Sequence, residues 1–261
     1  MYNLKQFFAV LDGVAPLKFS TMQIERGDYD NSGIIVDAGK DVKRVLFTLD
    51  LSLNAIKRAA ALKCDTIVTH HPAIYRPIKS IDCSGETKAL YFAVNKGFNV
   101  ISMHLNLDVA KNGIDESLSI ALGGKNAEIL DRLEDGVGYG REFAVNKPRE
   151  QFVKELKNTL NTKRVLVYGS EKTVKVTASF CGGGSGHAIC AVLENKTKAD
   201  TVITSDIPHH ALKTLIEEGK MVIILTHYSA ENYGFNKFYE KIKDKTCNNI
   251  EAFYFIDRRF L

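Results

Sequence analysis

The sequence contains no long hydrophobic run. Stretches such as Met221–Leu225 are far shorter than the roughly 18 consecutive apolar residues that a membrane-spanning helix needs. The first twelve residues also lack the basic region, the apolar stretch and the small-residue cleavage site that together make a secretory signal peptide. These absences exclude a membrane-spanning helix and export by the usual route, and we therefore expect a soluble, cytoplasmic protein.

Cysteine is sparse and is not arranged for cross-linking. The five cysteines are an odd number, and no two of them form a C-x-x-C pair. This pattern argues against a disulfide framework and against a zinc site built from thiolates. We interpret all five as reduced thiols in a cytoplasmic protein: Cys64, Cys83, Cys181, Cys190 and Cys247.

The chain also lacks an excess of one charge. It has 35 Lys and Arg against 31 Asp and Glu, and the resulting net charge of +4 gives little support to nucleic-acid binding or to an anionic membrane surface. With 45% hydrophobic and 25% charged residues, the composition is ordinary for a globular protein and excludes disorder and a coiled coil. The length of 261 residues, at roughly 150 per domain, predicts one or two domains.

Short β-branched runs alternate with helical patterns along the chain, which predicts an α/β fold with a parallel or mixed sheet covered by helices. In the first half, we predict strands at residues 44–49, 65–69 and 99–103, and helices after Ser52 and at residues 86–95 and 114–122. In the second half, we predict strands at residues 142–145, 164–168, 174–180, 201–204, 221–226 and 251–256, and helices at 148–160, after residue 186, at 208–218 and from about 230. A weakly patterned, glycine-rich segment at residues 134–140 divides the two halves. We therefore predict an N-terminal α/β lobe at residues 1–126 and a C-terminal α/β lobe at residues 127–261.

Seven histidines lie on or beside the predicted strand ends, where the ligand sites of open α/β sheets gather. Two of them are followed by a carboxylate four residues later, His104 by Asp108 and His227 by Glu231. If the second segment is helical, His227 and Glu231 share one face of the helix and can hold the same ion. Imidazole and carboxylate without thiolate suit zinc, iron, manganese or cobalt rather than calcium. The combination predicts a metal site.

The adjacent pair His70 and His71 leaves two arrangements open. Successive residues of a strand point to opposite faces, so both side chains reach one ion only if the chain bends, as Pro72 favours. Otherwise each histidine serves a different ion. Two ions about 3.5 to 4 Å apart, bridged by one carboxylate and one water, would account for the number of candidate ligands.

Other candidate residues have open roles. His209 and His210 fall at a predicted helix start and are ligands, substrate contacts or surface residues. The glycine cluster at residues 182–186, which precedes His187, forms either a tight turn that needs positive φ or a backbone nest for an anion. It lacks the Lys-Ser/Thr end of a Walker loop and the full G-x-G-x-x-G spacing of a dinucleotide fold. The chain also has no G-x-S-x-G nucleophile elbow.

Several motifs occur in the order found in one known family. From about Asp30 to Glu231, the sequence resembles the GTP cyclohydrolase I type 2 homologues, also known as NGG-interacting-factor-like dinuclear metal proteins. The similarity rests on Asp30-Asn31-Ser32-Gly33, Leu49-Asp50, Thr69-His70-His71-Pro72, His104-Leu105-Asn106-Leu107-Asp108 followed by Gly113, the glycine cluster, and His227-Tyr228-Ser229-Ala230-Glu231. Leu105, Thr226 and Ser205-Asp206 stand where the family commonly has Thr, Gly and Gly-Glu. None of these departures removes a candidate ligand.

The resemblance implies a dinuclear metal centre that holds two divalent ions per chain, zinc, iron or manganese. The ligands implied by motif position are His70, His71, Asp108, His227 and Glu231. Glu231 would be a candidate bridge, and His104 would lie close by and contact a ligand or the substrate. The family's fold implies two interlinked three-layer α/β lobes with the metal site in the cleft between them, in the short form without the middle insert domain. It also implies a homo-oligomer, a toroidal hexamer.

The resemblance and the predicted metal site lead to hypotheses from different classes. The first is a metal-dependent hydrolase resembling GTP cyclohydrolase I type 2, in which metal-activated water attacks the ring of a purine nucleotide or a phosphoester. The second is a non-catalytic oligomer that binds metal for regulation or for delivery elsewhere. A third, nucleic-acid binding through the hole of a ring, has little support from a net charge of +4.

Overall fold

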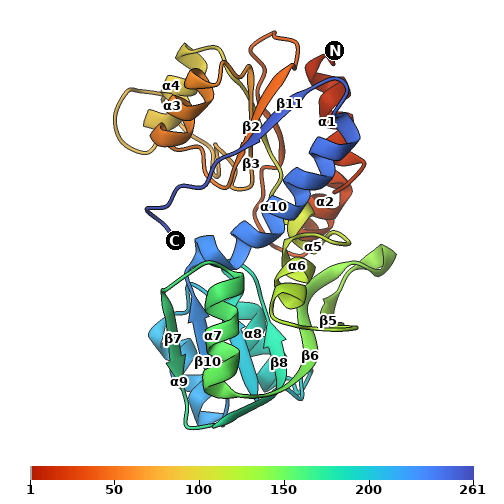
Figure 1. Cartoon of the computed structure of the whole chain (residues 1–261), viewed down its shortest axis with the longest axis vertical. Helices are drawn as coiled ribbons and strands as arrows, with labels where there is room; N and C mark the ends of the chain where they lie inside the picture. Colours follow the sequence, from red (N-terminus) through yellow and green to blue (C-terminus); the bar gives the residue numbers. More distant parts are fainter. Residues whose placement is uncertain (1) are drawn as a thin grey trace. The chain divides into compact units, whose positions relative to one another are not determined.

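The computed structural model describes residues 2–261, which fall into two compact units (Figure 1). Unit 1 comprises Met1–Ala110 and Phe235–Asp257, and unit 2 comprises Lys111–Gly234 and Arg258–Leu261. Each unit contains one mixed β-sheet flanked by helices, which confirms the predicted α/β class. The lobe boundary between residues 126 and 127 stays a prediction.

Unit 1 is built on a five-stranded sheet in the order β1-β4-β3-β2-β11. Strand β1 is antiparallel to β4, and the other neighbours are parallel. The strands are β1 (Gly33–Val36), β2 (Arg44–Thr48), β3 (Thr66–Thr69), β4 (Asn99–Ser102) and β11 (Glu251–Tyr254). The helices are α1 (Leu4–Asp12), α2 (Leu17–Glu25), α3 (Leu53–Ala61), α4 (Lys88–Asn95) and α5 (Leu105–Val109), joined by most of α10 (His227–Thr246).

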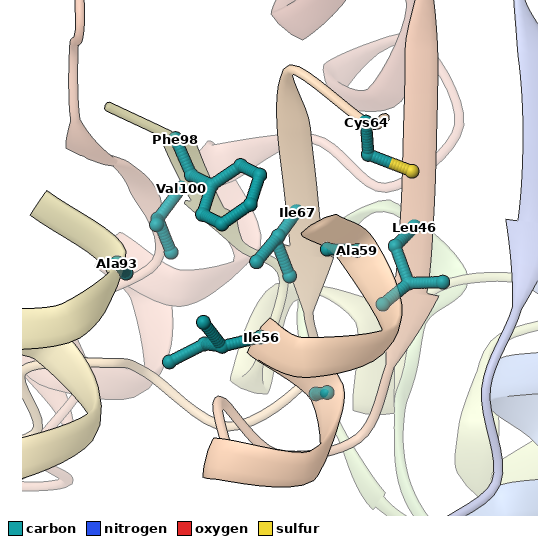
Figure 2. Close-up of a cluster of buried hydrophobic side chains, with 9 residues drawn as sticks. Leu46, Ile56, Ala59, Cys64, Ile67, Ala93, Phe98 and Val100 are labelled. Atoms are coloured by element: carbon teal, nitrogen blue, oxygen red, sulfur yellow. The ribbon is translucent and has the colours of Figure 1, made fainter. Parts of the chain in front are cut away.

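The two faces of this sheet are both covered, because neighbouring residues of strand β2 point to opposite sides and are both fully buried. Leu46 faces α3 and α4, where it packs with Ile56, Ile67 and Phe98 (Figure 2). Phe47 faces the other way, and its ring lies between 5.4 and 6.3 Å from three aromatic rings of α10. Figure 1 shows α3 and α4 on one side of the sheet and α1 and α10 on the other. Each such buried side chain stabilises the fold by about 1.5–3 kcal/mol.

Unit 2 is built on a six-stranded sheet in the order β5-β6-β8-β9-β10-β7. Its central strands β8, β9 and β10 are parallel, and the remaining pairs are antiparallel. The strands are β5 (Glu128–Arg132), β6 (Gly138–Pro148), β7 (Val165–Tyr168), β8 (Thr173–Ser179), β9 (Thr201–Thr204) and β10 (Met221–Leu225). The helices are α6 (Ile114–Ala121), the short η1 (Glu134–Gly136), α7 (Arg149–Thr159), α8 (Ser185–Leu193), α9 (His209–Glu217) and the start of α10. Val202 and Ile203 of β9 are both fully buried, so helices cover both faces of this sheet as well.

The predicted elements are all present, with ends that move by a few residues. Ser52 caps α3 as expected, because its Oγ accepts a hydrogen bond from the backbone N–H of Ala55 at 3.1 Å. Helix α10 begins at His227, earlier than the predicted start near residue 230. Strand β6 begins at Gly138, inside the segment predicted to divide the two halves. Among residues 2–261, no helix is both long and apolar enough to cross a membrane.

Candidate metal centre

In unit 1, the carboxyl ends of three parallel strands lie at one edge of the sheet. Thr48 of β2 is in register with Thr69 of β3, which is in register with Ser102 of β4. The residues that follow these positions therefore emerge side by side. They are Asp50 after β2, His70 and His71 after β3, and His104 after β4.

The three histidines at this edge form one cluster, here called the three-histidine cluster: His70, His71 and His104. Each residue offers one ring nitrogen, and these nitrogens lie within 4.8 Å of one another. His70 is fully buried, and the other two are partly exposed. The cluster shows how the adjacent residues His70 and His71 can both face the same point. Strand β3 ends at Thr69, and the chain then bends so that the backbone N–H of His71 donates to Leu49 at 2.9 Å.

Each ring of the three-histidine cluster is held through its Nδ1 atom. His71 Nδ1 lies 2.7 Å from Asp50 Oδ1, and His104 Nδ1 lies 2.7 Å from Asp30 Oδ1. His70 Nδ1 lies 2.8 Å from the backbone oxygen of Met103. An acceptor at Nδ1 selects the tautomer whose lone pair is on Nε2 and fixes the ring orientation, as in metal-binding histidines generally.

A carboxylate joins the cluster from helix α5. Asp108 is buried, and its Oδ1 lies 3.5 Å from Nε2 of His70. Its helix starts directly after His104, so the four-residue spacing noted in the sequence brings Asp108 back to the same edge of the sheet. Unit 1 therefore offers three imidazoles and one carboxylate at one place.

Asp30, which holds the ring of His104, is a buried carboxylate with a shifted pKa. Burial alone would raise its pKa, but the His104 hydrogen bond and charge, with hydrogen bonds from Ser20 and Ser32, outweigh burial and lower the pKa to about 2. Ser32 also accepts a hydrogen bond from the backbone N–H of His104 at 3.0 Å. Asp30 is thus held ionised as the acceptor for His104 at any pH above its lowered pKa.

The lowered pKa of Asp30 predicts an acid-dependent contribution to stability. A carboxyl with a depressed native pKa stabilises the fold above its unfolded pKa, near 3.8, and loses that contribution as the pH falls through about 2. We expect Asp30→Asn to lower the free energy of unfolding of the metal-free protein by about 2 kcal/mol at pH 6. The difference should shrink between pH 4 and pH 2. Urea titrations across this range measure it, with Asp41→Asn, at an exposed position, as the control.

A gap between Asp30→Asn and the unchanged protein that stays constant from pH 6 to pH 2 would contradict this interpretation.

In unit 2, a second group of polar residues follows the parallel strands β8, β9 and β10. Gly182 comes after β8, Asp206 after β9 and His227 after β10. Asp206 contacts Nδ1 of His227, and Nε2 of His227 lies 2.9 Å from Oε1 of Glu231. Because α10 is already helical at His227, the two residues share one face of its first turns. Glu231 is buried, and His227 is partly exposed.

Gly182 lies directly against this pair. Its φ of +52° is in the left-handed region, which favours glycine. A Cβ atom at this position would overlap Oε1 of Glu231 and lie 3.3 Å from Nε2 of His227. The backbone oxygen of Gly182 accepts a hydrogen bond from the hydroxyl of Ser205. The first glycine of the cluster therefore makes the tight turn that the sequence allowed, and it leaves room for the Glu231 carboxylate.

A buried ion pair holds the turn before Gly182. Arg141 and Asp115 are almost inaccessible to solvent, and their charged groups lie 2.9 Å apart. Oδ1 of Asp115 also accepts a hydrogen bond from the backbone N–H of Cys181 at 3.2 Å. The hydroxyl of Tyr139 donates to the backbone oxygen of Cys181. Both backbone polar groups of Cys181 are thus fixed by groups from other elements.

The remaining three histidines lie in helices α8 and α9. Nδ1 of His187, in α8, is 3.5 Å from Oδ2 of Asp131, and its ring lies 4.9 Å from that of Tyr139. His209 and His210 are exposed in the first turn of α9. None of the three belongs to a potential ligand group within residues 2–261.

Sequence reasoning assigned no role to the carboxylates that orient the histidines. Asp50 and Asp206 follow strands that are parallel neighbours of the histidine-bearing strands, so the strand-end rule could have identified both. Asp30 gives no such signal, because it precedes the antiparallel edge strand β1 and reaches His104 only through the fold.

The comparisons of this chain with family models, curated proteins and solved structures agree on one family. The family model described as Duf34/NIF3 (NGG1p interacting factor 3) matches residues 2–259. The chain is 33% identical over 217 residues to a GTP cyclohydrolase 1 type 2 homolog of Methanocaldococcus jannaschii, covering 81% of this chain and 85% of the relative. It is 25% identical over 256 residues to a protein of the same name from Clostridium perfringens, covering 95% and 94%. A Staphylococcus aureus crystal structure shares the fold, with a TM-score of 0.84 at 24% identity over 97% of this chain and 96% of that one.

Proposed function

Because this chain belongs to the Duf34/NIF3 family, we propose that it is a metal-dependent hydrolase that uses two divalent metal ions. The proposed ligands are His70, His71, Asp108, His227 and Glu231. Their family motifs support this assignment, and so does the local geometry of each group within its own unit. Glu231 is the proposed bridge between the two ions. The predicted homo-oligomer stays a prediction.

The observation that carries the proposal is the way the imidazoles are held. His71, His104 and His227 each contact an aspartate through Nδ1, and this pairing is typical of histidines that bind metal through Nε2. The potential ligand groups contain imidazole and carboxylate but no thiolate, which suits zinc, iron or manganese. The residues present therefore fit divalent metal ions.

When bound, such ions supply Lewis acidity, which lowers the pKa of water toward neutrality and stabilises negative charge on the attacked group. The chain's own residues supply the alignment. Asp50 and Asp206 fix the rings of His71 and His227, and the turn at Gly182 leaves room for the Glu231 carboxylate. His104, whose ring is held by Asp30 within the same cluster, would contact a metal ligand or the substrate.

The proposed substrate class is a purine nucleotide. Relatives named GTP cyclohydrolase 1 type 2 homolog are 25% and 33% identical to this chain over the aligned residues. The corresponding reaction would open the imidazole ring of GTP by hydrolysis and release formate. Hydrolysis of a phosphoester would use the same metal chemistry.

Metal analysis of the purified protein tests the site. We expect close to two divalent ions per chain, and a sharp fall in metal content for His71→Ala and for Glu231→Ala, since each loses a ligand atom. His210→Ala is the matched control, because it removes an exposed imidazole outside the proposed site. Unchanged metal content in both ligand variants would disprove the ligand assignment.

Turnover is tested separately on the metal-loaded protein. A screen of nucleotides and phosphoesters, with formate detection for GTP, should give activity that disappears in the ligand variants and persists in His210→Ala. If the metal-loaded protein turns over none of these compounds and instead passes an ion to an apo-acceptor, the protein is a metal carrier and the hydrolase proposal fails.

A further inference from the structure

Two exposed tyrosines touch each other in unit 1. Tyr29 is 41% exposed and Tyr75 is 46% exposed, and their ring centroids lie 5.3 Å apart at an interplanar angle of 68°. Single exposed apolar residues are common on protein surfaces. Two large exposed rings in contact are different, because together they expose a substantial aromatic area to water at one point. Such a pair is a candidate surface for an aromatic ligand.

The pair lies beside the three-histidine cluster. The ring of Tyr75 is 6.0 Å from the ring of His104, nearly perpendicular to it. Tyr29 directly precedes Asp30, which holds Nδ1 of His104. The side-chain amide of Asn31 donates to the backbone oxygen of Ile74 at 2.6 Å, so the segment of Tyr29 and the loop of Tyr75 are tied together. The tyrosines are therefore anchored to the same scaffold that orients a histidine of the cluster.

The chemistry of the pair favours a planar partner. Tyrosine loses little conformational freedom when it binds, and a nucleobase that stacks on an aromatic side chain binds about 5- to 150-fold more tightly. Exposed Arg76 and Lys79 follow Tyr75 in the same loop and favour a ligand that also carries negative charge. A planar heteroaromatic ring with a phosphate combines both properties.

We propose that Tyr29 and Tyr75 form an aromatic wall, in which the ring of Tyr75 stacks against the planar heteroaromatic ring of a nucleotide bound beside the three-histidine cluster and the ring of Tyr29, at 68° to it, contacts the edge of that nucleotide ring. The inference rests on the proposed function for the role of that nucleotide as substrate. The wall sets specificity, because a compound with the same phosphate but no aromatic ring has nothing to stack. It does not bind metal, so its contribution can be measured independently of the ions.

Calorimetric titration of the full-length protein with GMP and with ribose 5-phosphate tests the wall. We expect Tyr75→Leu to weaken GMP binding about tenfold, as the loss of one stacking contact predicts, and to leave ribose 5-phosphate binding unchanged. Tyr75→Phe keeps the ring and should bind GMP within about twofold of the unchanged protein. Ile78→Ala is the matched control, because Ile78 is a 39% exposed apolar residue of the same loop without a ring.

Equal GMP binding by Tyr75→Leu and the unchanged protein would overturn the proposal, as would equal losses for GMP and ribose 5-phosphate. Size-exclusion chromatography of the same variants adds a further criterion. If Tyr75→Leu and Ile78→Ala both change the oligomeric state, the loop is a protein interface and the wall is disproved. Metal content separates the two proposals. If the protein has its normal metal content but does not bind GMP, only the proposal of an aromatic wall is overturned. If GMP binding depends on Tyr75 but the protein contains no metal, only the proposal of a metal-dependent hydrolase is overturned.

Discussion

Replacing Gly182 by alanine is expected to reduce the metal content of the protein by about half and to weaken binding of the remaining metal at least tenfold. The reason is steric. The added Cβ would overlap Oε1 of Glu231, so the carboxylate must leave the position in which it faces His227. The φ of +52° adds backbone strain of roughly 1–2 kcal/mol for an alanine. Metal analysis and a metal titration of the purified variant measure the effect.

The neighbouring Gly183 supplies the matched control. A Cβ atom at Gly183 would meet nothing within 4 Å, and its φ is outside the left-handed region. Gly183→Ala therefore makes the same chemical change one residue away and should bind metal normally. If Gly182→Ala and Gly183→Ala bind equal amounts of metal with equal affinity, Glu231 is not a ligand at the position the fold gives it.

Replacing Arg141 by leucine is expected to destabilise the protein by about 3–5 kcal/mol, because it leaves the Asp115 carboxylate buried without its cation. Burial already raises the pKa of Asp115 to about 6, although Arg141 and the Cys181 N–H oppose that rise. Without the guanidinium the pKa should rise further. Urea denaturation of the variant and the unchanged protein gives the difference in free energy of unfolding.

The pH dependence of this loss has a definite sign. A carboxyl whose native pKa is raised contributes most to stability below its unfolded pKa, near 3.8, and loses that contribution as the pH rises through the native value of about 6 or above. Arg141→Leu should therefore be more destabilising at pH 8 than at pH 5. A loss that is the same at both pH values would show that Asp115 is not left as an uncompensated charge.

Two further variants separate burial of a charge from loss of packing. Adding Asp115→Leu to Arg141→Leu removes both charges and should recover much of the stability, since an apolar pair of similar volume often replaces a buried ion pair. Lys213→Ala breaks the exposed ion pair with Glu217 in α9 and should cost less than about 1 kcal/mol. The contrast between these two ion pairs tests whether burial, rather than the number of contacts, determines how much the free energy of unfolding falls when an ion pair is broken.

The parts of the fold that the sequence predicted are those with strong periodic patterns. The parallel strands β3, β4 and β9 are short, fully buried runs rich in β-branched residues, and the sequence predicts their positions to within a residue or two. Helix α1 was missed, although Asn3 and Gln6 form a capping box there and its buried residues recur at helical spacing. Strand β5 was missed because it is a half-exposed edge strand with mixed composition.

Some residues of the candidate site can be predicted from the sequence, and others cannot. Histidines at strand ends and the two four-residue spacings could be recognised because each is a local pattern. The expectation that His104 lies close to the ligands agrees with its place in the three-histidine cluster, and its role there stays a prediction. Contacts such as Asp30 with His104, or Asp115 with Arg141, join residues far apart in the chain, and no local pattern encodes them.

The chain order of unit 1 has a consequence for biosynthesis. Strand β2 is made early, but its neighbour β11 and the α10 rings that cover Phe47 are made after nearly all of unit 2. On the ribosome, β2 would therefore present an open edge while unit 2 emerges and folds. The sheet of unit 1 is thus begun before the sheet of unit 2 and completed after it. A nascent chain stalled before β11 would carry the three-histidine cluster on an unfinished sheet.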